Sequence, residues 1–349
     1  MTLDTRQGTR PFPLVALDAM GGDRGAEVNV EGAVAAAGEF GAHVLLVGDE
    51  QVVKRELARH AQPRLPIEIR HAPEAVEMAE SPAAALRRKK QSSIRIGMDL
   101  VKHGDADAFV SAGNTGAVMA TALVVLGALP GVERPAIAVR VPTLTGQAVL
   151  LDAGANVDSK ARHLLQFAIM GNVYTRDLLG RPRPRVGLLS IGEEESKGNE
   201  LTREAFKALE EEPSLHFIGN VEGRDVFSGA ADVVVCDGFI GNVALKISEG
   251  IVEAMFHLLQ EELRKDLRGR AGSLLLVPSF RRFKRRIDSS ETGGAPLLGV
   301  NGVCIISHGR STAKAIKNAV RVAGDCVSTK VIPHIREGIP SPDGRRTDH

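Results

Sequence analysis

Short apolar runs alternate with longer segments of helical period along most of the chain. Several runs are apolar at every position, which is typical of strands covered on both faces of a sheet. The runs predict strands at Leu14–Leu17, Val44–Val47, Ile67–His71, Ala108–Ser111, Ala136–Val141, Ala148–Asp152, Arg185–Ser190, His216–Gly219, Asp232–Cys236 and Val303–His308. The segments between them predict helices at 26–39, 50–60, 82–103, 114–129, 158–179, 200–211, 241–267 and 310–330. This alternation predicts an α/β fold with a largely parallel sheet and right-handed connections.

The 349 residues exceed the usual range of a single core. We therefore expect one α/β catalytic unit over residues 12–335, with two intimately joined lobes as a possible form of it. Residues 1–11 carry an acid and a proline without a signal-like apolar run, and they predict a flexible leader. The polar residues 336–349 predict a disordered tail. No apolar run reaches the length of a membrane span.

The segment 267–291 departs from the regular pattern. It places an apolar patch beside a cluster of Lys and Arg, the composition of an anchor that lies on a membrane surface. A basic helix that packs its apolar patch on a second copy of the chain is the alternative. The residues concerned are Leu274, Leu275, Leu276, Arg281, Arg282, Lys284, Arg285 and Arg286.

Composition narrows the classes of partner. The formal net charge of +1 argues against nucleic acid as a partner of the whole surface. Cys236, Cys304 and Cys326 lack the paired short spacing of a zinc site or a disulfide framework, which favours a reducing, cytoplasmic compartment. Metal motifs such as HExxH are absent from the sequence, and so is the GxSxG turn of a serine nucleophile. We therefore expect no metal and no covalent nucleophile.

Candidate chemistry lies in turns where an apolar strand ends and Gly, Asn, Asp, Ser or Thr precede a helix. In a parallel sheet the carboxyl ends of the strands meet at one edge, where ligands bind. Glycines allow close approach to an anion, and helix N-termini offer it free N–H groups. Together the turns predict a shared polar cleft suited to phosphate, although each turn alone could be an ordinary capped loop. The turns are ALDAMGGD (16–23), SAGNTGA (111–117), LDAGANVD (151–158), LSIGEEESKGNE (189–200), CDGFIGN (236–242) and GGAP (293–296).

These turns supply the candidate phosphate or substrate ligands. None of them matches a Walker A loop or a GxGxxG fingerprint, so we expect no nucleotide, no NAD and no other cofactor. The residues are Asp18, Gly21, Gly22, Asp23, Gly113, Asn114, Thr115, Asp152, Asn156, Asn199, Asp237, Gly238, Gly241, Gly293 and Gly294.

Two further side chains could act on the substrate directly. Lys197 lies in a Gly-containing turn before a helix, where its ammonium could meet phosphate or a developing oxyanion. It could equally be a surface ion-pair partner of the acids at 193–195. Asn242 could donate through its amide, or it could only cap a helix. His308 ends a strand, where either acid–base work or a structural role is open.

Taken together, ALDAMGGD, SAGNTGA, LLDAGANVD, GLLSIGEEESKGNELT, FIGNVEGRD, DVVVCDGFIGNVALK and GGAPLLGVNG resemble the phosphate acyltransferase family of bacterial phospholipid synthesis, the PlsX family. The resemblance runs from about Leu14 to Val331. One departure is the long leader before Leu14. Another is the run of three acids in GEEESKGN, which bears on the surroundings of Lys197.

The resemblance implies an αβα sandwich similar to isocitrate and isopropylmalate dehydrogenases and to phosphotransacetylase. It also implies a cytoplasmic homodimer that associates peripherally with the membrane. The implied reaction converts acyl carrier protein thioester and inorganic phosphate into acyl phosphate, which a membrane glycerol-phosphate acyltransferase then uses. The lysine of the KGN turn and the asparagine of the DGFxGN turn, here Lys197 and Asn242, are the implied catalytic residues.

This chemistry does not require a nucleophilic side chain, because phosphate is itself anionic and a thioester is an activated acyl donor. We therefore expect phosphate to attack the thioester directly, with Lys197 and Asn242 binding phosphate and the oxyanion. The basic face of 267–291 could receive the acidic carrier protein by electrostatic steering. The rival functions are a phosphotransacetylase-like enzyme that uses acyl-CoA and a non-catalytic membrane-associated scaffold.

Overall fold

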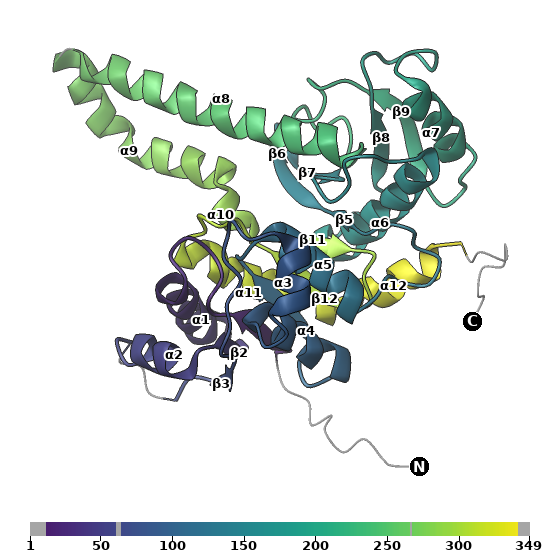
Figure 1. Ribbon diagram of the computed structural model, residues 1–349. Coiled ribbons are helices and arrows are strands. Elements are labelled where there is room, and N and C mark those ends of the chain that lie inside the picture. The colour runs from purple at the N-terminus through teal and green to yellow at the C-terminus, as the bar shows by residue number, and fades with distance from the viewer. Residues whose placement is uncertain (1–11, 61–63, 266, 341–349) are drawn as a thin grey trace. The chain divides into compact units, whose positions relative to one another are not determined.

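The computed structural model describes residues 12–60, 64–265 and 267–340. The chain folds into two compact units (Figure 1). Unit 1 contains the described residues of 1–135, 173–182 and 292–349, and unit 2 contains those of 136–172 and 183–291. The predicted leader 1–11 lies outside the described residues, as does the end of the predicted tail from 341 onward.

Unit 1 is built on a sheet whose strands follow the order β3-β2-β1-β4-β12-β11. Neighbouring strands from β3 to β12 are parallel, and β11 is antiparallel to β12. The central strand β1 is buried at every position, which explains its uninterrupted apolar sequence. The strands are β1 (Leu14–Asp18), β2 (His43–Gly48), β3 (Ile67–His71), β4 (Ala108–Ser111), β11 (Ala295–Leu298) and β12 (Val303–Ile306).

Helices cover this sheet, and α1 packs most extensively on α11. A side chain at Gly32 of α1 would collide with Ile316 of α11, so glycine permits this close helix pair. The helices are α1 (Ala26–Phe40), α2 (Glu50–Leu57), α3 (Pro82–Arg88), α4 (Ser93–His103), α5 (Thr115–Val125), α11 (Ala313–Ser328) and α12 (Val331–Gly338). The short helix α10 (Ser289–Thr292) precedes the return of the chain to unit 1.

Unit 2 has a second sheet, with the order β6-β7-β10-β8-β9. Its strands are parallel except for β6, which is antiparallel to β7. A buried cluster around Val141, Leu150 and Val234 forms part of its core. The strands of this sheet are β6 (Val139–Thr143), β7 (Gly146–Leu151), β8 (Arg185–Leu189), β9 (His216–Val221) and β10 (Val233–Val235). The short strand β5 (Ala136–Ile137) precedes β6 in the sequence and is not part of this sheet.

The helices of unit 2 include a long hairpin. Helix α8 (Gly238–Arg264) and helix α9 (Leu267–Ile287) pack against each other (Figure 1). Helix α7 (Glu200–Glu210) follows β8 in the sequence, and α6 (Ala161–Leu179) begins in unit 2 and ends in unit 1. None of the helices in the described ranges is both long enough and apolar enough to cross a lipid bilayer.

The predicted α/β class with largely parallel sheets is confirmed, and most predicted elements lie within a few residues of their observed positions. The prediction of one continuous strand at Ala136–Val141 is wrong, because two separate strands, β5 and β6, cover this region. The predicted helix 82–103 is likewise interrupted, since Lys89 ends α3 and Ser92 caps α4. Strand β11 and helix α12 were not predicted. Because α12 ends at Gly338, the first three residues of the predicted tail are helical.

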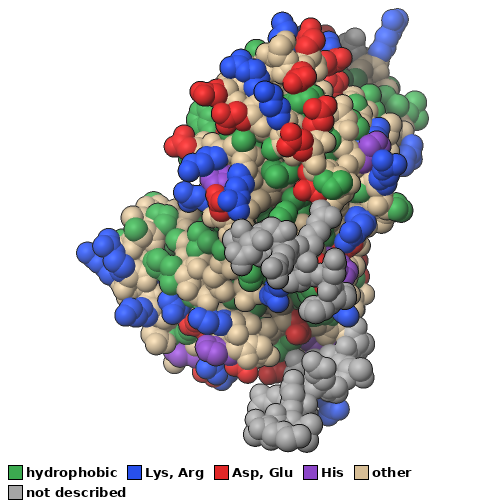
Figure 2. Space-filling model, turned by 90° about the vertical axis from the view of Figure 1, so that its right-hand side faces the viewer, with side chains coloured by type: hydrophobic (Ala, Val, Ile, Leu, Met, Phe, Trp, Pro, Cys, Tyr) green, Lys and Arg blue, Asp and Glu red, His purple; other side chains and the backbone are tan. Residues whose placement is uncertain are grey.

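Charge on the surface follows the near-zero net charge. On the face shown in Figure 2, Lys and Arg side chains intermingle with Asp and Glu. This distribution agrees with the formal charge of +1 and shows no single-sign field over that face.

Candidate functional site

The six polar turns do not share one sheet edge, because the chain forms two sheets. In unit 1 the turns after β1 and β4 lie at the carboxyl edge of the sheet. Gly293 and Gly294 join them there, since antiparallel pairing places the start of β11 beside the end of β12. In unit 2 the three turns follow β7, β10 and β8, which are neighbours in that order. The prediction of a single edge is therefore corrected to two edges with three turns each.

At the edge of unit 1, Asp18 is a buried anchor of the turn that follows β1. Its Oδ1 accepts hydrogen bonds from the N–H groups of Met20 and Gly21, both at 3.1 Å. Its Oδ2 accepts a hydrogen bond from Ser111 Oγ at 2.7 Å, which links the turns after β1 and β4. Burial raises the pKa of Asp18, although these hydrogen bonds oppose the shift.

The glycines of this edge bring backbones together. A side chain at Gly21 would lie 2.7 Å from the N–H nitrogen of Gly113, and Gly113 itself donates to Ser111 Oγ at 3.0 Å. Gly22 has a φ of 89°, a backbone conformation that favours glycine. Next to it, Asp23 donates its N–H to Gly309 O at 2.9 Å, and its side chain is exposed.

Asn114 holds the start of α5. Its Oδ1 accepts the N–H of Ala117 at 3.0 Å, and its Nδ2 donates to Met78 O and Glu80 O, each at 2.9 Å. Both ends of the amide therefore have structural partners. Thr115, the first residue of the helix, is exposed.

Gly293 and Gly294 also serve close packing. Both have positive φ, 78° and 72°. A side chain at Gly293 would collide with the backbone of Asn318, and one at Gly294 would meet Ile305 and Ser307. Their demonstrated role is therefore steric.

At the edge of unit 2, Asp152 is the centre of a buried hydrogen-bond network. Its Oδ1 accepts the N–H groups of Ile137 at 3.0 Å, Gly154 at 3.2 Å and Ala155 at 3.0 Å. Its Oδ2 accepts from Asn156 twice, from the backbone N at 2.7 Å and from Nδ2 at 2.9 Å. Burial nevertheless raises the pKa of Asp152, because desolvation outweighs the opposing hydrogen bonds.

The N-terminus of α8 rests on this network. Asp237 caps the helix by accepting the N–H of Ile240 at 2.9 Å. A side chain at Gly238 would lie 2.5 Å from Asp152 Oδ2, and one at Gly241 would overlap Asp152 O. Only glycine at both positions lets the helix approach the turn so closely.

Asn242 follows at the fifth position of α8, so its alternative interpretation as a helix cap is wrong. The residue is exposed, and its side chain lies beside Gly154. Within the described part of the chain its amide has no hydrogen-bond partner. The amide therefore stands available at the edge of the buried Asp152 network.

Lys197 lies in the turn after β8. Its backbone N–H donates to Glu194 O at 3.0 Å, and its side chain is exposed. The ammonium forms no ion pair with any described residue. The acid at 193 pairs with Arg224 instead, at 3.4 Å. Two residues later, Asn199 caps α7 by accepting the N–H of Thr202 at 2.9 Å.

Cys236 and the candidate His308 both make contacts within the fold. Cys236 is buried with its Sγ 3.5 Å from Asp152 O, and burial raises the pKa of its thiol well above the ordinary value. A thiol in that state is a poor nucleophile at neutral pH. His308 is exposed, and its Nδ1 accepts the N–H of Arg310 at 3.1 Å.

The segment 267–291 is mostly helical, as α9, with Pro278 inside the helix. Leu274 and Leu275 are 74% and 83% exposed, and Leu276, Arg281 and Arg282 are exposed as well. Arg286 turns back to β6 and donates to Thr143 O at 3.1 Å and to Leu144 O at 2.7 Å. The side chains of Lys284 and Arg285 lie outside the described part of the structure.

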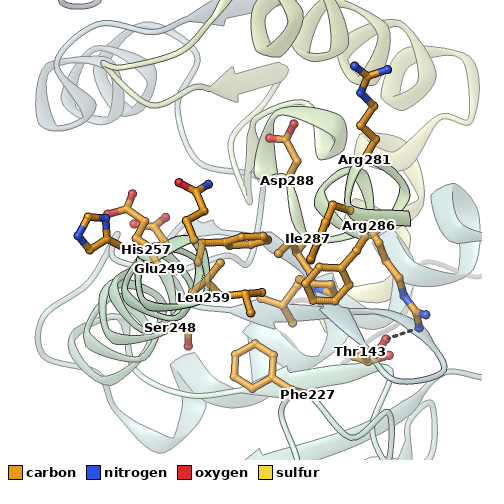
Figure 3. Close-up of a pocket in the computed structure, with 18 of the residues that line it drawn as sticks. Thr143, Phe227, Ser248, Glu249, His257, Leu259, Arg281, Arg286, Ile287 and Asp288 are labelled. Carbon is orange, nitrogen blue, oxygen red and sulfur yellow. Dashed lines mark hydrogen bonds between the residues drawn. The ribbon is translucent and has the colours of Figure 1, made fainter. Parts of the chain in front are cut away.

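A pocket of about 1240 Å³ in unit 2 was not predicted. It is bounded by β6, α8 and α9, and Figure 3 shows Phe227 and Leu259 directed toward its middle and His257 at its outer side. The signal that could have found it is an apolar stripe along α8. Leu245, Val252, Phe256, Leu259 and Leu263 recur at helical spacing and line the pocket.

Comparisons with known proteins agree with this architecture. A family model described as fatty acid synthesis protein matches residues 14–334. A phosphate acyltransferase of Trichlorobacter lovleyi is 53% identical over 323 residues, covering 93% of each chain. A phosphate acyltransferase of Geotalea uraniireducens is 54% identical over 330 residues, covering 93% of this chain and 95% of the relative. Among solved structures, a phosphotransacetylase from Streptococcus pyogenes has a TM-score of 0.60 and 20% identity, covering 93% and 95% of the two chains. At that identity the likeness concerns the fold.

Proposed function

The chain belongs to the fatty acid synthesis protein family whose relatives are phosphate acyltransferases, and on this premise we propose that it transfers a long acyl chain from acyl carrier protein to inorganic phosphate. The product is acyl phosphate, and the free carrier protein thiol leaves. The observation that carries the proposal is a pair of exposed groups, Lys197 and Asn242, which lie on neighbouring turns of one sheet edge and have no partners among the described residues.

The geometry of unit 2 supports this pairing. Strand β10 lies between β7 and β8, and adjacent strands are separated by about 4.8 Å. The turn that leads into Asn242 is therefore flanked by the Asp152 network on one side and by the Lys197 turn on the other. Asp152 is buried, and Gly238 and Gly241 pack closely against it. The network therefore holds the helix that carries Asn242 in a fixed position.

In the proposed mechanism an oxygen of phosphate attacks the thioester carbonyl. A C–O bond forms, and the carbonyl oxygen carries the negative charge of the tetrahedral intermediate. Lys197 binds the phosphate, and the Asn242 amide donates to the oxyanion. Collapse of the intermediate breaks the C–S bond and releases the thiolate, which takes up a proton from water. The protein contributes positioning and electrostatic stabilisation, and no covalent acyl-enzyme forms.

The test is to trap the product. The purified protein, long-chain acyl carrier protein and phosphate are incubated, and hydroxylamine converts acyl phosphate into a hydroxamate. We expect hydroxamate that depends on phosphate and is formed faster with acyl carrier protein than with short-chain acyl-CoA. Preference for acyl-CoA would identify a phosphotransacetylase-like activity. Absence of phosphate-dependent hydroxamate with either donor would reject catalysis, because thioesters themselves react slowly with hydroxylamine.

We also propose a homodimer, supported by an exposed apolar stripe on α8. Phe239, Val243, Ile247, Ile251 and Met255 are each between 42% and 65% exposed. Such a contiguous apolar surface is typical of an interface. Light scattering after Ile251→Asp should show a monomer where the unaltered chain is a dimer, with an unchanged far-UV spectrum. A dimer mass for both the unaltered chain and Ile251→Asp would place the interface elsewhere, and a monomer mass for the unaltered chain would reject the homodimer.

The proposal further assigns the exposed leucines of α9 to a membrane surface, in the cytoplasm, where a glycerol-phosphate acyltransferase takes the acyl phosphate. Supporting it, Leu274 and Leu275 project from a helix that also carries exposed Arg281 and Arg282. Vesicles with anionic lipid should sediment the protein, and Leu274→Gln with Leu275→Gln should abolish sedimentation. Retained sedimentation would reject the anchor and leave carrier-protein docking as the role of the basic face.

A further inference from the structure

We propose that the pocket between β6, α8 and α9 is the binding groove for the acyl chain of the substrate, with the guanidinium of Arg140 at its polar end. The inference rests on the proposed function and names where the apolar part of that substrate lies. All of the lining residues belong to unit 2 (Figure 3).

Helix α8 runs from the reactive edge, at Asn242, into the wall of the groove. Counting from Asn242, the residues Leu245, Glu249, Val252 and Phe256 follow at steps of three or four along the helix. Such spacing keeps them on one face of an α-helix. All four line the pocket. An acyl chain whose carbonyl lies at Asn242 therefore has a lined path along the same face of the helix.

The opposite wall begins at the same edge. Strand β6 is antiparallel to β7, with Val139 opposite Leu150 and Arg140 opposite Val149. Its first residues thus lie near the carboxyl end of β7, where the Asp152 turn starts. Ile137, two residues before β6 begins, donates its N–H to Asp152 Oδ1. The wall then continues from Val139 to Leu144, away from the turn.

Size and lining favour a long apolar ligand. The pocket measures about 1240 Å³, and its helical wall from Leu245 to Arg264 is roughly 28 Å long at 1.5 Å per residue. One leaflet of a bilayer holds acyl chains over about 15 Å, half of its hydrocarbon thickness. Phe227, Leu259 and Phe283 contribute apolar side chains to the lining. A membrane-length acyl chain fits this wall lengthwise.

Two buried nitrogens of Arg140, a charged residue of the groove, have no hydrogen-bond partner among the described residues. Nε and Nη2 of Arg140 are buried, and within the described part of the chain neither has a hydrogen-bond partner. Arg140 lines the pocket, and burying donors without acceptors is unfavourable. A carboxylate, or the phosphate of an acyl phosphate, would supply the missing acceptors. The combination of an apolar groove and an unpaired guanidinium matches an amphiphile with an anionic head.

The groove can be tested by direct binding, without turnover. The probe is cis-parinaric acid, a fluorescent fatty acid, and the chain contains no Trp. The fluorescence of the probe rises when it enters an apolar site, so it reports binding directly. Gly250→Ala on α8 is the matched control, because its added Cβ meets no neighbour within 4 Å, and it should bind the probe as the unaltered chain does. Val252→Trp, two residues further on, fills the groove and should weaken binding tenfold or more.

Arg140→Gln is the second variant, chosen because it leaves the apolar volume nearly unchanged. It should weaken binding of parinaric acid about tenfold, since charged hydrogen bonds are lost, and leave binding of neutral parinaryl alcohol unchanged. Equal loss for both probes would reject the guanidinium contact. Far-UV spectra and melting temperatures of all three variants establish that they fold.

The kinetic counterpart separates this inference from the proposed function. In Val252→Trp the KM for long-chain acyl donors should rise tenfold or more, while short-chain donors are used as before, because each buried CH₂ contributes roughly fourfold in affinity. No binding of parinaric acid by the unaltered chain, or an unchanged long-chain KM in Val252→Trp, would overturn the groove. Probe binding without any hydroxamate formation would instead overturn the proposed reaction and leave the groove in place.

Discussion

The two sheet edges carry similar sequences, yet their polar side chains have different surroundings. At the edge of unit 1, Asp18 and Asn114 are fully engaged with backbone and side-chain partners. At the edge of unit 2, Asp152 is engaged in the same way, but Lys197 and Asn242 stand exposed above it without partners among the described residues. Motif residues that look equivalent in sequence thus divide into those that build a turn and those that remain free to meet a ligand.

The largest expected effect concerns the exposed ammonium of Lys197 in unit 2. Lys197→Ala should lower kcat by roughly two to three orders of magnitude, since one lost donor to a transition-state charge has that cost. Hydroxamate formation at saturating substrate measures it. The matched control is Lys207→Ala, an exposed lysine of α7, which should leave kcat unchanged. A near-normal rate in Lys197→Ala would remove the distinction between the two edges.

The second prediction concerns the close packing of Gly241, the residue before Asn242, on the Asp152 turn. Gly241→Ala should destabilise the fold by about 1–3 kcal/mol, because the added methyl group overlaps Asp152 O. Urea unfolding measures the change. Gly250→Ala on the same helix is the control; it meets open space and should stabilise the fold by about 0.5–1 kcal/mol. Similar behaviour of both variants would mean that α8 does not rest tightly on the Asp152 turn.

A third prediction concerns the buried carboxyl of Asp152. Asn in its place would turn an NH₂ group toward N–H donors and should cost about 1–3 kcal/mol. Burial raises the folded-state pKa above the ordinary 3.8, so the folded chain binds this proton more tightly than the unfolded chain. The stability contributed by Asp152 is therefore greatest below 3.8 and declines as pH rises through the raised pKa.

Denaturant unfolding of both proteins at several pH values from 3.5 upward tests this sign. The advantage of the unaltered chain over Asp152→Asn should shrink as pH rises through that window. An advantage that grows with pH would show that the five hydrogen bonds outweigh desolvation.

At the edge of unit 1 we expect a structural effect alone. Asn114→Ala removes the cap of α5 and should cost about 1 kcal/mol, with kcat within threefold of the unaltered enzyme. Thermal unfolding and the hydroxamate assay measure the two quantities. A large loss of rate at preserved stability would instead support the predicted phosphate contact of Asn114.

The smallest effect concerns the acids beside Lys197. Changing Glu193, Glu194 and Glu195 to Gln should lower the KM for phosphate about twofold at low salt, because exposed charges interact weakly and are screened. The difference should vanish at high ionic strength. A tenfold change in the KM for phosphate would mean that these acids interact strongly with the ammonium of Lys197.

The order of strands and helices could be predicted from the sequence alone, because burial on both faces leaves uninterrupted apolar runs and helices leave a period of 3.6 residues. The candidate turns followed from the same pattern, since Gly and Asp at strand ends reflect local backbone needs. The sequence of α9 concealed its helix, because glycines and Pro278 interrupt the apolar period.

Only the tertiary structure decided which polar side chains have hydrogen-bond partners. Asp18 and Asp152 look alike in sequence as residues at strand ends, and so do Asn114 and Asn242 as residues near helix starts. Whether a side-chain amide has hydrogen-bond partners depends on carbonyl groups from distant parts of the sequence. Asn114, for example, donates to the carbonyl oxygens of Met78 and Glu80. The proposed acyl groove likewise required β6, α8 and α9 to meet, and only that packing buries two nitrogens of Arg140 without a hydrogen-bond partner among the described residues. Local pattern determines elements, whereas contacts between distant segments determine which polar groups remain available for chemistry.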